Sequence, residues 1–191
     1  MIDFTEYVEQ SGLHDVLENI LRKYSADSWN SVSKTAACHF YSTHEIPISR
    51  RMTVVEEEPD IRSMIDTFRN GGNCLDKSIF LASLLSHVDG VESRFTEIER
   101  RPDGHILLET RFPGFDREEV EERLLSFYQW NHDFGSYQFA WEERYGKSVW
   151  VVTDPGLSRY IGDVEALREE GYAETEEGGW GWNYPTQTQP V

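Results

Sequence analysis

The chain has 191 residues, of which 38% are hydrophobic and 13% aromatic, enough for one compact domain with a core. Asp and Glu number 35 against 18 Lys and Arg, a net charge of −17 at pH 7 that repels phosphate backbones and anionic membrane surfaces. This balance argues against nucleic-acid and membrane binding. No apolar run is long enough for a membrane span, and the acidic start lacks a signal-peptide pattern, so we expect a cytoplasmic protein.

The acidic residues are spread along the whole chain rather than gathered in one tail. Two explanations fit this pattern: a cationic partner, or adaptation to high salt, where screening removes self-repulsion and dense carboxylates maintain solubility. We favour adaptation to salt, which concerns where the protein works rather than what it does. The two cysteines, Cys38 and Cys74, form no CxxC pair, so neither a disulfide framework nor a zinc ribbon or thioredoxin-type site is indicated.

The first half of the chain is predicted to be mainly helical. Apolar residues recur at the helical period over 4–24 and again over 61–69. Residues 26–49 are rich in Ser, Thr and His without a clear period, which predicts a mixture of loop and short helix. A Gly-Gly pair then ends one helix before the next begins, over about 73–87. The inward face of the 61–69 helix is expected to consist of Ile61, Met64, Ile65 and Phe68.

The second half is predicted to hold the sheet. Strands over 91–99 and 105–112 form a hairpin, and a third strand ends at Asp154-Pro155. Helices first and a small antiparallel sheet afterwards indicate an α+β fold rather than an alternating βαβ series. Between the strands, a helix over 116–130 and an irregular aromatic stretch interrupt the sheet, and a short helix over 163–170 follows it. We expect one domain over 1–191, with a core at about 60–155, an insertion at about 113–145 and a flexible tail at about 176–191.

Cys74 has the surroundings of a nucleophile. It lies at the first turn of the predicted 73–87 helix, where free N–H groups and the helix dipole favour a thiolate and can donate to a substrate oxyanion. Gly71 and Gly72 are expected to leave room for a substrate backbone. His105, at the start of a strand, is the candidate base, and Asp154, at the end of the next strand, is the candidate carboxylate that orients it.

Three segments in this order resemble the transglutaminase-like superfamily, whose members have a papain-like fold. "GGNCLDKSIFLASLL" resembles its G-x-C-x-D segment, "GHILLE" its histidine strand and "WVVTDP" its W-x-x-x-D-P segment. The resemblance covers about 60–155. It implies a nucleophile helix packed on a small antiparallel sheet, with a catalytic triad of Cys74, His105 and Asp154.

The chain also departs from the family pattern. The family often has Trp where this chain has Leu107, and the spacer from His105 to Asp154 is longer because of the insertion. The insertion is expected either to cap the cleft and select the substrate, or to block it. Trp29 is the one upstream side chain suggested for completing an oxyanion hole.

Other polar residues have plainer interpretations. Asp76 is a first-turn acid that suits the helix dipole without a role in the cleft. Cys38, His39 and His44 have a spacing that fits no common ligand set, so we interpret them as structural and expect no metal and no organic cofactor.

Two functions remain open from the sequence. The first is thiol acyl transfer on a peptide or protein substrate with an amide carbonyl. An acyl-enzyme on Cys74 resolved by water gives a cysteine protease or amidase, and one resolved by an amine gives a transglutaminase. The alternative is a catalytically inactive scaffold of the same fold that binds peptides or partner proteins, alone or within a larger assembly.

Overall fold

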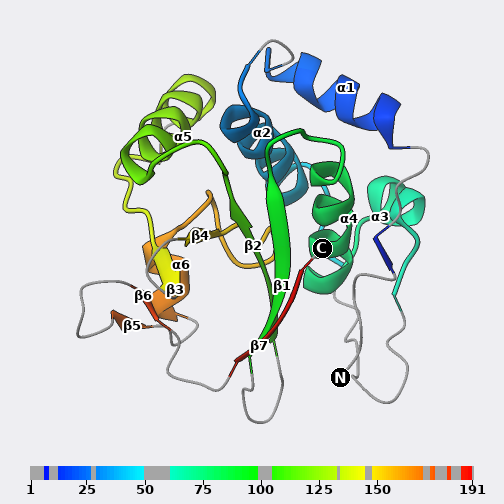
Figure 1. Cartoon of the computed structure of the whole chain (residues 1–191). Helices are drawn as coiled ribbons and strands as arrows, with labels where there is room; N and C mark the ends of the chain where they lie inside the picture. The colour runs from blue at the N-terminus through cyan, green and yellow to red at the C-terminus, as the bar shows by residue number, and fades with distance from the viewer. Residues whose placement is uncertain are drawn as a thin grey trace.

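The computed structural model shows an α+β fold in which helices cover an antiparallel sheet (Figure 1). The structure describes residues 7–8, 13–26, 29–49, 61–98, 105–132, 134–144, 148–169, 173–174, 180–181 and 186–190. The helices in these ranges are α1 His14–Lys23, α2 Ser31–His44, α3 Met64–Asn70, α4 Cys74–Leu85, α5 Arg117–Asn131 and α6 Val164–Glu169. The strands are β1 Glu92–Ile98, β2 His105–Arg111, β3 Trp141–Arg144, β4 Ser148–Val152, β5 Ala173–Glu174, β6 Trp180–Gly181 and β7 Thr186–Pro190.

The main sheet has the order β3-β4-β2-β1-β7, and every neighbouring pair is antiparallel. β1 and β2 form the predicted hairpin, with Glu92 opposite Arg111 and Ile98 opposite His105. β2 then pairs with β4, although α5 and β3 lie between them in the chain. β3 was not predicted, and the tail predicted to be flexible contains β7, which pairs with β1. Helix α4 packs on β1 and β2, as the sequence predicts.

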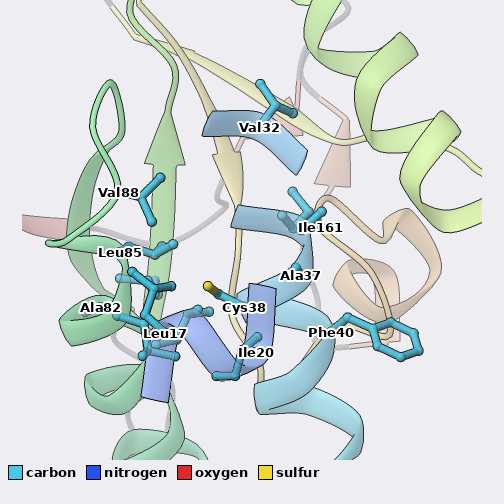
Figure 2. Packing of buried hydrophobic residues seen from close by; sticks show 14 of the residues in the cluster. Leu17, Ile20, Val32, Ala37, Cys38, Phe40, Ala82, Leu85, Val88 and Ile161 are labelled. Carbon is cyan, nitrogen blue, oxygen red and sulfur yellow. The ribbon is translucent and has the colours of Figure 1, made fainter. Parts of the chain in front are cut away.

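Helix α2 is the central helix of the layer, which corrects the prediction of loop and short helix over 26–49. It contacts α1, α4 and α5. Because it is covered on several sides, its solvent-facing strip is narrow and its amphipathic period is weak. In Figure 2, Cys38 of α2 lies among apolar side chains of the neighbouring helices. The buried residues of α2 are Val32, Ser33, Thr35, Ala36, Ala37, Cys38, His39, Phe40 and Ser42.

The helices on either side follow the predictions more closely. Helix α1 occupies the C-terminal half of the predicted 4–24 helix; most of the remainder of that range lies outside the described residues. Helix α3 begins at Met64, where the Ser63 hydroxyl accepts a hydrogen bond from the Asp66 N–H at 3.2 Å. Met64 is buried, but Ile65 is 53% exposed, so its predicted place on the inward face is wrong. A helix of only seven residues buries a single narrow stripe.

The two faces of the sheet are chemically different, because neighbouring residues in a strand point to opposite sides. Phe95 and Leu108 pair across β1 and β2 and belong to the core beneath the helices. The adjacent pair, Arg94 and Glu109, forms an ion pair at 2.8 Å on the other face, where Glu109 is fully buried. The Arg94 guanidinium lies 4.1 Å from the ring centroid of Trp150 on β4. The contact with Trp150 adds a side-chain link between β4 and the hairpin to the backbone pairing of β4 with β2.

Candidate functional site

Cys74 is exposed at the first position of α4, and a capping box holds the start of this helix. The Asn73 side chain accepts a hydrogen bond from the Asp76 N–H at 2.9 Å, and the Asp76 carboxylate accepts one from the Asn73 N–H at 3.0 Å. The other Asp76 oxygen accepts from the Arg62 N–H at 2.9 Å. Asp76 is thus the first-turn acid that the sequence predicts. Both of its carboxylate oxygens accept backbone hydrogen bonds that position the helix carrying Cys74.

The two glycines before Cys74 do not leave room for a substrate, which corrects the prediction. Both are buried. Gly71 has φ +79° and ends α3, and a Cβ at this position would collide with the Pro47 carbonyl. A Cβ on Gly72 would lie 2.5 Å from the Asp76 Cβ. Neighbouring protein atoms therefore fill the space around this pair. The absence of side chains on the two glycines allows Pro47 to approach Gly71 and Asp76 to approach Gly72.

Asp154 lies next to Cys74. It is fully buried in the turn after β4, where its Oδ1 accepts hydrogen bonds from Gly156 N–H at 2.7 Å and Leu157 N–H at 3.2 Å. A Cβ on Gly156 would lie 2.5 Å from the Cys74 Cβ and 3.2 Å from the Asp154 Oδ1. The turn thus rests on the first residue of α4. The structure thus brings these two predicted site residues close to the same glycine.

The structure gives the backbone position of His105 relative to Asp154. It is the first residue of β2, and the Thr153 N–H donates to the Leu108 carbonyl at 2.8 Å as β4 ends beside β2. Because β2 and β4 are antiparallel, β4 ends on the side of the sheet where β2 begins. Asp154, just after β4, and His105, at the start of β2, therefore lie toward the same ends of these two strands. The His105 side chain lies outside what the structure describes, so its role as base stays a prediction.

Lys77 is the member of this group that the sequence analysis missed. It lies one turn after Cys74 on α4, is 0% exposed, and donates from its Nζ to the Thr43 carbonyl at the end of α2, at 3.1 Å. Burial lowers the pKa of Lys77 to about 8, although the negative charges of Asp154 and of a Cys74 thiolate oppose the shift. The sequence does contain one signal for this residue: Lys77 is three positions after Cys74, a spacing that puts both on the same side of a helix.

Cys38 and His39 of α2 are fully buried. Burial lowers the pKa of His39 to about 3, against an interaction with the backbone of Asp154, so this imidazole is neutral at ordinary pH. Burial raises the pKa of the Cys38 thiol to about 12. A ring nitrogen of His44 is hydrogen-bonded to the Arg159 carbonyl at 2.9 Å. Within the described residues, no three or more His, Cys, Asp or Glu side chains gather in a way that could hold a metal ion.

Helix α5, the helical part of the insertion, packs on α2 rather than on α4. It follows the Arg111 end of β2, opposite to the His105 end, and lies at the upper left of Figure 1. Its inward residues are confirmed: Val120, Leu124, Phe127 and Tyr128 are buried. The aromatic stretch that follows joins the core, where Phe134 and Tyr137 pack against Tyr160 at centroid distances of 5.5 and 5.2 Å.

Trp29 is not part of this site, which corrects the suggestion that it completes an oxyanion hole. It precedes α2 and packs edge-on against Phe127 of α5, with 6.0 Å between ring centroids. Lys77 meets α2 at Thr43, near the opposite end of a 14-residue helix. At 1.5 Å per residue, about 20 Å of helix separates the two ends. Trp29 instead lines a hollow of about 450 Å³ with residues of α5, among them Trp130.

Comparisons with known proteins do not assign the chain to a family. No protein-family model, curated protein or solved structure matches it. Among the described residues, no helix has the length and apolar character that crossing a membrane requires.

Proposed function

We propose that this protein is a thiol acyl-transfer enzyme with a transglutaminase-like, papain-like core, in which Cys74 is the nucleophile. One observation carries the proposal. An exposed cysteine at the start of a capped helix lies against the turn that holds a buried aspartate, beside the strand that begins with His105. This placement supports a Cys-His-Asp triad, and the three residues occur in the order of the motifs they resemble.

The reaction assigns a separate role to each residue. The Cys74 thiolate attacks the carbonyl carbon of an amide, and His105, which has taken the thiol proton, returns it to the departing amine. The resulting thioester is released by water or by a second amine. The Asp154 Oδ1 is held by two backbone N–H groups, so the proposal assigns the contact that orients His105 to Oδ2.

The oxyanion is assigned to the start of α4. The Asp76 N–H already donates to the Asn73 side chain, so it belongs to the cap. We therefore assign the backbone N–H of Cys74, with the positive end of the helix dipole, to the developing negative charge. The capping box serves this step because it holds the first turn in place before the substrate arrives.

The test is the pH dependence of Cys74 alkylation by iodoacetamide in high salt. We compare wild type with His105→Ala and Asp154→Asn, and use Cys74→Ala to subtract any signal from Cys38. The proposal expects wild-type Cys74 to react well below pH 8 and His105→Ala to lose that reactivity. Asp154→Asn should weaken it, because the imidazole is no longer held in one tautomer.

Substrate turnover is then measured with glutamine-containing peptides, with and without added hydroxylamine. Release of ammonia in water supports an amidase, and hydroxamate formation supports transfer to amines. If Cys74 reacts like an ordinary thiol and is indifferent to His105, the catalytic proposal fails. The protein is then the binding scaffold that is the alternative function.

A further inference from the structure

Lys77 holds a charge where an apolar residue would be expected. It is completely buried, among α4 neighbours such as Ile79 and Phe80 that belong to the core. Fully buried lysines are rare, because removing an ammonium from water is unfavourable unless it is paired. The described hydrogen bond of its Nζ is to the backbone carbonyl of Thr43, which is neutral. That single bond does not explain why a cation occupies this position.

The charged neighbours of Lys77 come from three elements. On its own helix the neighbour is Cys74, one turn earlier; on the turn after β4 it is the buried Asp154. Helix α2 contributes His39 and His44, both close enough to repel the ammonium if protonated. The pKa of each histidine is lowered by burial, so both are mainly neutral near pH 7. The negative groups that act on the ammonium are therefore the Asp154 carboxylate and, when the Cys74 thiol is ionised, its thiolate.

We propose that Lys77 is a positioning residue of the Cys74 site, whose buried ammonium supplies the positive charge that accompanies the Cys74 thiolate. The inference rests on the proposed function, since it takes Cys74 as the nucleophile. The geometry behind it is the i, i+3 placement on α4 and the contact of the Asp154 turn with Cys74 through Gly156. Lys77 transfers no proton in this role, and the thiol proton goes to His105.

The fixed end of the side chain suits this role. The Thr43 carbonyl, near the C-terminus of α2, belongs to the last turn, where carbonyls lack partners within the helix and the dipole favours a cation. The ammonium is therefore anchored at the end of α2, on an element other than the helix that carries Cys74. A charge held in place in a water-poor site acts on a neighbouring thiolate more strongly than a solvated surface lysine does.

The first test compares Lys77→Met with wild type in the Cys74 alkylation profile, with Lys34→Met, a lysine of α2 that reaches solvent, as matched control. Met keeps the length and apolar stem of the side chain without its charge. We expect the Lys77→Met profile to move upward by about one pH unit, so that the reaction is about tenfold slower at pH values below the midpoint of the wild-type profile. The Lys34→Met profile should coincide with wild type.

The second test needs no substitution and holds even if Lys77→Met fails to fold. The rate ratio of anionic iodoacetate to neutral iodoacetamide is measured at Cys74 in wild type, relative to free cysteine. A buried ammonium beside the thiolate should raise this ratio above that of free cysteine, despite the net charge of −17. The ratio should fall as the pH passes about 8, where Lys77 loses its proton.

The outcomes separate the two proposals. If wild-type Cys74 reacts at low pH and depends on His105 but not on Lys77, the positioning role is overturned and the catalytic proposal stands. A ratio at or below that of free cysteine overturns the role as well. If Cys74 is unreactive in wild type, the proposed function fails and this inference fails with it.

Discussion

Replacing Lys77 with Met should change how stability depends on pH. Burial lowers the pKa of Lys77 from 10.5 to about 8, so between these values the unfolded chain binds more protons than the folded one. The free energy of unfolding of the lysine-bearing protein therefore rises with pH across this window, relative to the methionine variant. Integrating the proton difference from pH 7 to pH 10 gives a relative gain of about 2 to 3 kcal/mol for lysine.

The assay is urea denaturation of both variants at closely spaced pH values, in constant high salt. Both carry Cys74→Ser, which removes the thiol titration that is coupled to Lys77. The difference between the variants cancels other groups that titrate in this range, such as Cys38. Lys34→Met measures what the loss of any lysine does to the curve. A difference that stays flat from pH 7 to pH 10 would refute the burial of a charged Lys77.

Two further predictions concern the structure around the site. Asp76→Asn leaves one acceptor oxygen for the two N–H groups, of Asn73 and Arg62, that the carboxylate binds. It should lower the free energy of unfolding in urea by about 1 to 2 kcal/mol. The matched change Asp66→Asn, at an exposed aspartate of α3, should have little effect, and equal losses would contradict the importance of the cap. Iodoacetamide at pH 8 should label Cys74 in the native protein and Cys38 only after unfolding, because Cys38 is buried with a pKa raised to about 12. Mass spectrometry of the labelled peptides decides this, and native labelling of Cys38 would show that α2 is not packed as described.

The elements that the sequence predicted well are those with local signals. The Gly-Gly pair, Asn73 and the apolar run after Cys74 define α4, and the alternating residues of β1 and β2 define the hairpin. Helix α2 was missed for the opposite reason. A helix buried on several sides can use Ser, Thr, Ala and Cys throughout, and then neither its period nor its propensity stands out.

The residues of the candidate site also fall into those that local sequence patterns predict and those that only the tertiary structure shows. The position of Cys74 at a helix start, and of His105 and Asp154 at strand ends, follows from local pattern. The contact of Gly156 with Cys74 and the bond from Lys77 to Thr43 depend on how distant elements meet. A lysine in a helix is normally solvated, so only the tertiary structure shows that this one is not. The same holds for Gly71, where Pro47 from a distant part of the chain fills the space that a side chain would need.

The strand β7 has a practical consequence for anyone handling this protein. It pairs antiparallel with β1 and so occupies an edge of the main sheet. An uncovered edge strand is a template for pairing with a second molecule. Removing residues 186–190 would uncover one side of the β1 backbone. Truncation at this end would therefore make the seven-residue β1 the edge strand in place of the five-residue β7, and a longer edge favours self-association.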